Sequence, residues 1–179
     1  MGKFDKFKID LRGMKAATAT YEMDIDNTYF ANIDGPEVQK GKATVLTTVV
    51  KKDDSFQISF DIKGSVVVTC DRCLDEMDQP IETSGALSVK LGKDYGEQGD
   101  TIVVPEREGF INVAWYIYEY VALAIPIKHV HAPGRCNKGM ANVLSQHSVG
   151  DEEAQASDDS SYDGETDPRW DALKEILDN

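Results

Sequence analysis

Hydrophobic and polar residues alternate along much of the first half of the chain. The pattern is clear at Tyr21, Met23 and Ile25, which are separated by acidic residues. Further stretches of this kind are a β-branched run at 43–50, a segment at 56–60, a Val-rich segment at 65–69 introduced by Gly64, the stretch 81–91 after Pro80, and short pieces at 101–104 and 110–111. A period of two predicts half-buried strands, and polar residues between them predict turns. We therefore expect a mainly antiparallel sheet, either open or curled into a partly closed barrel.

One segment has the pattern of a buried helix. Residues 113–125 are apolar nearly all round, with Glu119 as the exception. Asn112 is placed to cap the N-terminus of this helix, and Pro126 ends it. A helix this apolar is expected to pack on the sheet and to be covered on its other side as well. Together the strands and this helix predict an α+β fold.

The C-terminal part of the chain differs in composition. Residues 150–166 are acidic, rich in serine and poor in aromatic side chains, which predicts a disordered linker. Asp167 and Pro168 then begin a predicted helix. Its short amphipathic face is formed by Trp170, Leu173 and Leu177. The predicted organisation is thus a β-rich domain at 1–149, a linker at 150–166 and a helix at 167–179.

The charge of the chain is concentrated in this tail. The formal net charge is −13, and residues 151–179 contribute 11 acidic and 2 basic side chains. The remainder holds 21 acidic and 17 basic residues, so the predicted domain is only mildly acidic and a nucleic-acid partner is not excluded. Residues 1–10 lack the apolar core of a secretory signal, and the apolar stretch 113–127 is too short to span a membrane. We expect a cytoplasmic protein with no membrane partner.

Three cysteines provide the candidate chemistry. Cys70 and Cys73 form a CxxC pair directly after a predicted strand, and two thiolates at this spacing chelate one tetrahedral ion from a tight turn. Cys136 lies in a Pro/Gly loop after the apolar helix, together with His131. These four residues predict a Cys3His zinc site that joins the two loops. His129 is an alternative fourth ligand, and unmetallated thiols are the alternative to a metal site.

The sequence gives no indication of catalysis. A thioredoxin-like redox motif opens a helix, whereas the residues after Cys73 have no helical apolar face and soon reach Pro80. A fully Cys/His-ligated ion also leaves no open position for a catalytic water. The chain has no P-loop, no GxGxxG pattern and no His-Glu-x-x-His motif. We therefore expect a non-enzymatic protein without a small-molecule substrate.

The order of these motifs resembles the YceD-like family of large-ribosomal-subunit RNA accumulation proteins. The similar features are a Val-rich strand leading into Cys70-Asp-Arg-Cys73-Leu, an apolar helix running into Leu123-Ala-Ile-Pro126 with His131 and Cys136 after it, and the ending Asp167-Pro168-Arg169-Trp170-x-Ala172-Leu173. They span about residues 60–179. The chain departs from many relatives in the second cluster, where Cys136 stands alone instead of in a further CxxC pair.

The resemblance implies a role in accumulation of large-subunit ribosomal RNA, and so in ribosome biogenesis. The expected partner is a large-subunit precursor, contacted through ribosomal RNA or through a basic ribosomal protein. Candidate partner-binding residues are Arg72, Lys128, Arg135 and Lys138 near the loops, and Trp170, Leu173 and Leu177 in the tail. The alternative is a zinc-stabilised protein-interaction adaptor unrelated to ribosomes.

Overall fold

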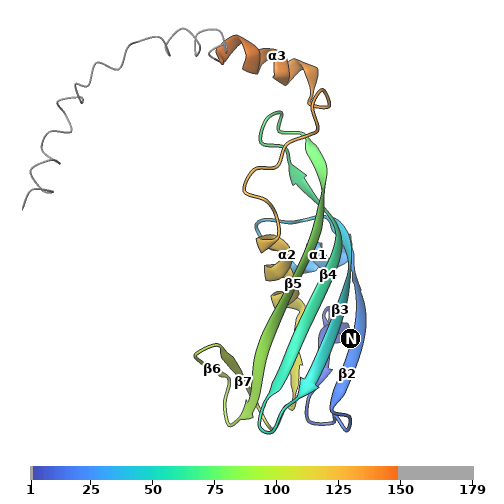
Figure 1. Ribbon diagram of the computed structural model, residues 1–179, viewed down its shortest axis with the longest axis vertical. Coiled ribbons are helices and arrows are strands. Elements are labelled where there is room, and N and C mark those ends of the chain that lie inside the picture. The colour runs from blue at the N-terminus through green and yellow to red at the C-terminus, as the bar shows by residue number, and fades with distance from the viewer. Residues whose placement is uncertain (1, 149–179) are drawn as a thin grey trace, which may run out of the picture. The chain divides into compact units, whose positions relative to one another are not determined.

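The computed structural model describes residues 2–148 of the chain. Residues 1–137 form one compact unit, and the described part of the second unit is helix α3 (Lys138–His147). Figure 1 shows the arrangement of the strands and helices of the first unit. The predicted linker and the predicted C-terminal helix lie outside the described residues.

A six-stranded sheet forms the framework of the first unit. The strands are β2 (Thr18–Ile25), β3 (Gly41–Lys51), β4 (Phe56–Thr69), β5 (Glu76–Gly92), β6 (Gly96–Gln98) and β7 (Thr101–Pro105). Their order is β2-β3-β4-β5-β7-β6, and every neighbouring pair is antiparallel except β5 and β7. The predicted α+β class with a mainly antiparallel sheet is confirmed, and within residues 2–148 the sheet is open, with no closed barrel. A separate two-stranded sheet pairs β1 (Lys8–Asp10) with β8 (Phe110–Asn112).

Two strands are longer than the sequence pattern predicts. The prediction of a new strand after Gly64 is wrong, because β4 runs unbroken through this residue. Gly64 pairs with Ala43, and a Cβ atom at position 64 would collide with the backbone of Lys42 and Ala43. Strand β5 likewise contains Pro80, where only β4 pairs with it, because β7 pairs with residues 88–92. Strand β5 thus has an unpaired edge at this position, which is where a sheet accommodates the N–H that proline lacks.

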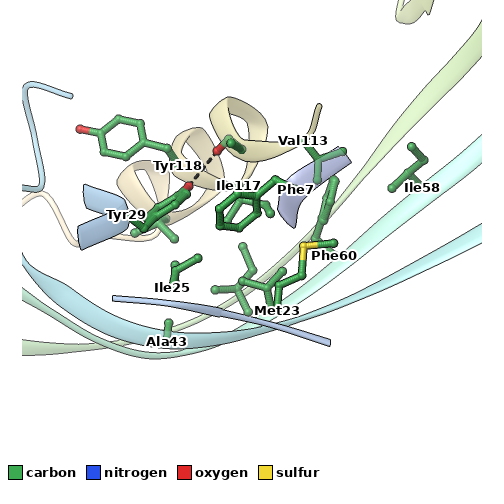
Figure 2. Packing of buried hydrophobic residues seen from close by; sticks show 14 of the residues in the cluster. Phe7, Met23, Ile25, Tyr29, Ala43, Ile58, Phe60, Val113, Ile117 and Tyr118 are labelled. Carbon is green, nitrogen blue, oxygen red and sulfur yellow. Dashed lines mark hydrogen bonds between the residues drawn. The ribbon is translucent and has the colours of Figure 1, made fainter. Parts of the chain in front are cut away.

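The hydrophobic core lies on one face of the six-stranded sheet. Alternate residues of β3 and β4 are buried there, and Thr44, Asp61 and Lys63 on the opposite face are exposed. Two helices cover the buried face, α1 (Asn27–Ile33) and α2 (Ala114–Leu123). The buried hydroxyl of Tyr29 in α1 donates a hydrogen bond of 2.7 Å to the carbonyl of Ala114 in α2 (Figure 2). This bond links the two helices and satisfies the one polar atom of the tyrosine side chain.

The sequence predicts one helix in this unit, and the structure has a further short one. Helix α1 has a cap signal, since the side chain of Asp26 accepts a hydrogen bond from the backbone N–H of Tyr29. At 7 residues it is too short for its apolar periodicity to be distinctive. A 3₁₀ turn at Asp5–Phe7 adds the buried Phe7 to the core.

Helix α2 occupies most of the range predicted for it. It begins at Ala114, one residue later than predicted, and the side chain of Asn112 accepts a hydrogen bond of 3.0 Å from the Ala114 N–H. Ile117 points into the core toward the sheet (Figure 2), where it is fully buried. The outer side of α2 is not covered within residues 2–148, because Trp115 is 48% exposed and Leu123 is 81% exposed. The expectation of cover on both sides is therefore not met in the described part of the chain.

One buried polar group in the core leads to a stability prediction. Thr47 faces the core between Val45 and Val49, is 0% exposed, and its hydroxyl has no hydrogen-bond partner within residues 2–148. An unpaired buried hydroxyl is destabilising, so Thr47→Val is expected to raise the free energy of unfolding by about 1 kcal/mol. Urea titration measures the change. Thr48→Val, on the opposite face, is the control with an expected change below about 0.5 kcal/mol, and destabilisation by Thr47→Val would contradict the prediction.

Candidate metal centre

Cys70 and Cys73 lie in the turn that joins β4 to β5. The turn is closed by two backbone hydrogen bonds of 2.9 Å, from the Leu74 N–H to the Cys70 carbonyl and from the Cys70 N–H to the Asp75 carbonyl. Leu74 adopts a left-handed conformation with φ of 62°, which lets the chain reverse directly after the second cysteine. Both cysteines are buried, with exposed fractions of 0% and 2%. A strand, and no helix, follows Cys73, which agrees with the argument against a thioredoxin-like motif.

The loop after α2 is bound to this turn. The Asp71 N–H donates a hydrogen bond of 3.0 Å to the His129 carbonyl, and the His129 N–H donates one of 2.7 Å to the Asp71 carboxylate. The His131 N–H lies 3.4 Å from the Cys70 sulfur. These contacts bring together two segments that are far apart in the sequence, and they place His131 next to the cysteine pair.

The structure brings the four predicted ligands into one cluster. The ligand atoms of Cys70, Cys73, His131 and Cys136 all lie within 4.8 Å of one another, and the Cys73 sulfur is 3.3 Å from Nδ1 of His131. Three sulfur donors and one imidazole nitrogen form a ligand set typical of zinc, whose bonds to such atoms are about 2.0–2.3 Å long. The residues present therefore fit a tetrahedral zinc ion.

His129, the alternative fourth ligand, is engaged elsewhere. Its Nδ1 lies 3.0 Å from the Pro126 carbonyl, and its Nε2 lies 3.5 Å from the Asp71 carboxylate. The imidazole of His129 thus holds the loop against the turn, while His131 faces the cysteines. The sequence did not distinguish the two histidines, since that choice depends on contacts with Asp71.

The electrostatics of the cluster favour a bound cation. Burial raises the pKa of Cys70, but the backbone N–H groups of His131, Cys73 and Arg72 outweigh this effect and lower it to about 6. The pKa of Cys136 is raised to about 11, first by burial and then by its hydrogen bonds to Cys73 and Cys70 and their negative charge. Three neighbouring thiols do not all ionise without a compensating positive charge. A bound divalent cation would supply that charge.

The basic residues of the two loops lie in surroundings of mixed charge. Arg72, Lys128 and Arg135 are exposed, and none of them forms an ion pair within residues 2–148. A cavity of about 580 Å³ beside the cluster is lined by Val67, Glu76, Met77, Asp78, His131, Ala132 and Arg135. Lys138 begins α3 in the second unit. The remaining predicted partner-binding residues, Trp170, Leu173 and Leu177, lie outside the described residues.

The fold and this cluster define a class of protein. It is an α+β protein in which a hairpin and a loop distant in sequence present a Cys3His ligand set. Among the described residues, no fifth side chain of a metal-binding type belongs to this group. The chain belongs to the YceD family, described as "Large ribosomal RNA subunit accumulation protein YceD", whose model matches residues 58–177. This range includes all four residues of the cluster.

The other comparisons add little to this assignment. Neither the search of curated proteins nor that of solved structures gives a significant match. No helix within residues 2–148 is long and apolar enough to cross a membrane. The description of the family links it to accumulation of large-subunit ribosomal RNA.

Proposed function

We propose that this chain is a non-enzymatic factor in large ribosomal subunit biogenesis, which supports accumulation of large-subunit ribosomal RNA by binding an assembling particle. The family match over residues 58–177 carries this proposal. It favours a ribosomal role over an adaptor unrelated to ribosomes. The contact is made either with RNA or with a basic ribosomal protein.

The proposed role of the metal centre is structural. Zinc would be held by Cys70, Cys73, His131 and Cys136, and it would fix the turn before β5 to the loop after α2. A zinc ion with four protein ligands has no open position for a reacting water. In this proposal the ion positions the exposed loop residues Arg72, Lys128 and Arg135 for contact with a partner.

The proposed partner contacts lie in two places. The loops present basic side chains, which are suited to a phosphate or a carboxylate. The acidic tail offers charge complementarity to a basic ribosomal protein, and Trp170, Leu173 and Leu177 provide a short apolar face suited to a groove. Docking of this face onto the chain itself is the alternative use of the same residues.

Sedimentation of the tagged protein in native lysate at low salt tests the proposal. Migration with large-subunit precursors, and not with mature translating ribosomes, is the expected result. Recovery of the protein only at the top of the gradient, under conditions that preserve the precursors, would contradict it. Crosslinking of the precursor fraction then separates contact with RNA from contact with a protein.

Removal of the tail gives a separate prediction. Truncation after Gly150 or the substitution Trp170→Ala is expected to reduce association with precursors by roughly tenfold, because a tryptophan in an interface often contributes a large share of the binding free energy. The sedimentation profile measures this change. Tyr162→Ala, in the predicted linker, is the matched control with association expected to stay unchanged. Full association of the truncated protein would remove the tail from the mechanism.

A further inference from the structure

The outer side of helix α2 carries large side chains that the described chain leaves exposed. Trp115, Glu119 and Leu123 follow one another at intervals of four, so they share one side of the helix. Trp115 is 48% exposed, and its indole Nε1–H donates a hydrogen bond of 2.8 Å to the Glu119 carboxylate. An indole ring is thus fixed in place at the surface with a carboxylate beside it.

Further aromatic residues contact Trp115 or interact with Tyr116, its neighbour in the chain. The rings of Trp115 and the buried Tyr118 are 5.5 Å apart, which supports the indole from below. Tyr116 is half-buried, and its pKa is raised first by burial and then by the charges of Glu119 and Glu97 and by Tyr95. Tyr95 is 59% exposed, and its hydroxyl donates a hydrogen bond of 3.4 Å to the Glu108 carboxylate. We call the residues Tyr95, Trp115, Tyr116, Glu97, Glu108 and Glu119 the aromatic–acidic surface.

The segment of the chain that carries this surface is acidic. Residues 93–123 carry six carboxylates and only two basic side chains, Lys93 and Arg107. Within residues 2–148, none of Glu97, Glu108 and Glu119 forms an ion pair. Such a surface repels the phosphates of RNA, and it attracts a cationic partner.

We propose that the aromatic–acidic surface binds an arginine-containing segment of a basic protein. A guanidinium group stacks on the face of an indole or phenol ring, and it forms paired hydrogen bonds with a carboxylate. Trp115 and Glu119 offer both elements side by side, already held together by their own hydrogen bond. Arginine is preferred to lysine because its planar group makes both interactions at once. This inference rests on the proposed function and deepens it, by choosing a basic protein over RNA as the partner of this surface.

The test is a binding titration with the full-length protein. The probe is a fluorescently labelled peptide of about ten residues with alternating arginine and glycine, at low salt, followed by anisotropy. We expect Trp115→Ala and Glu119→Gln each to weaken binding by roughly fivefold, in line with the strength of a cation–π or charged contact. Glu119→Gln retains the acceptor for the indole N–H and removes only the charge. Trp115→Phe, which keeps an aromatic face, is expected to retain most of the affinity.

Two controls make the result specific. Leu46→Ala removes a 42% exposed side chain from β3 and is expected to leave binding unchanged. The matched lysine peptide is expected to bind several times more weakly than the arginine peptide.

The proposal would be overturned if wild type, Trp115→Ala and Glu119→Gln bound the peptide with equal affinity. It would also be overturned if only the truncation after Gly150 abolished binding, because the tail would then be the peptide site. A third contrary result would be tighter binding of a single-stranded RNA oligonucleotide than of the arginine peptide, with that RNA binding abolished by Trp115→Ala.

The two proposals fail in different ways. If the protein migrates with large-subunit precursors but Trp115→Ala binds the arginine peptide normally, the aromatic–acidic surface is excluded and the ribosomal role remains. If the arginine peptide binds at Trp115 but the protein never migrates with precursors, the ribosomal role is excluded and the surface remains.

Discussion

Replacement of Cys70 by serine is expected to abolish the binding of about one equivalent of zinc per chain. Cys70 is fully buried, its sulfur lies within 4.8 Å of the other three ligand atoms, and it also accepts the hydrogen bond from the His131 N–H. A serine hydroxyl is a poor zinc ligand, since the softer thiolate is preferred. Elemental analysis of the purified protein measures the loss of metal.

Loss of the ion is expected to loosen the two loops more than the sheet. The core residues of β3 and β4 form their contacts without the cluster, whereas the loop at 128–136 is attached through it and through Asp71. Hydrogen exchange is therefore expected to rise in the turn at 70–75 and in this loop, both in Cys70→Ser and after treatment with a strong chelator. Amides at the centre of β3 and β4 are expected to keep their protection.

His129→Ala provides the matched control for the metal centre. This histidine contacts Asp71 and the Pro126 carbonyl, and it lies outside the group of four ligands. The variant is expected to retain its zinc, whereas His131→Ala is expected to lose most of it. The assignment would be contradicted if Cys70→Ser kept its full zinc content. It would also be contradicted if wild-type protein, expressed in zinc-supplemented medium, were well folded but contained no metal.

Phe60→Ala is expected to lower the free energy of unfolding by about 3–5 kcal/mol. Phe60 lies in β4, is 0% exposed, and packs against Tyr120 with ring centroids 5.7 Å apart. Figure 2 shows it among the side chains between the sheet and α2. Truncation removes the apolar area of the ring from the core and leaves a cavity that the surrounding strands fill only in part. Urea denaturation measures the difference.

A second substitution on the same sheet tests whether burial is the cause. Leu46 lies on the opposite face of β3 and is 42% exposed, so Leu46→Ala is expected to cost less than about 1 kcal/mol. A loss of under about 1 kcal/mol in Phe60→Ala would contradict the placement of the core on this face. Phe60→Leu, which keeps much of the volume, is expected to fall between the two alanine variants.

Much of the fold could be predicted because the local pattern of hydrophobic and polar residues reflects which side chains are buried. The alternation at Tyr21, Met23 and Ile25 corresponds to β2, and the apolar run after Asn112 corresponds to α2. The CxxC pair indicated a turn after a strand, and the structure has a turn between β4 and β5 at that point. Each of these features depends on residues that are close in the sequence, where side-chain periodicity directly reflects one buried face.

Features that depend on neighbours in space could not be predicted in this way. Gly64 and Pro80 usually interrupt strands, but each is accommodated by its surroundings in the sheet. At Gly64 the backbone of β3 approaches closely, and at Pro80 strand β5 is paired on one side only, with β4. The parallel pairing of β7 with β5 likewise follows from the path of the chain through β6, and no local pattern specifies it.

The sequence by itself determined the β-rich class, the approximate positions of the main strands and of the apolar helix, and which side chains have the chemistry of zinc ligands. The tertiary structure decided that His131, 58 residues after Cys73, is the histidine at the thiols while His129 binds Asp71. It also decided that the sheet stays open and that Trp115 remains exposed beside Glu119. The physical reason is that local periodicity fixes which side of an element avoids water. Which distant groups meet there is set by the packing of the whole unit.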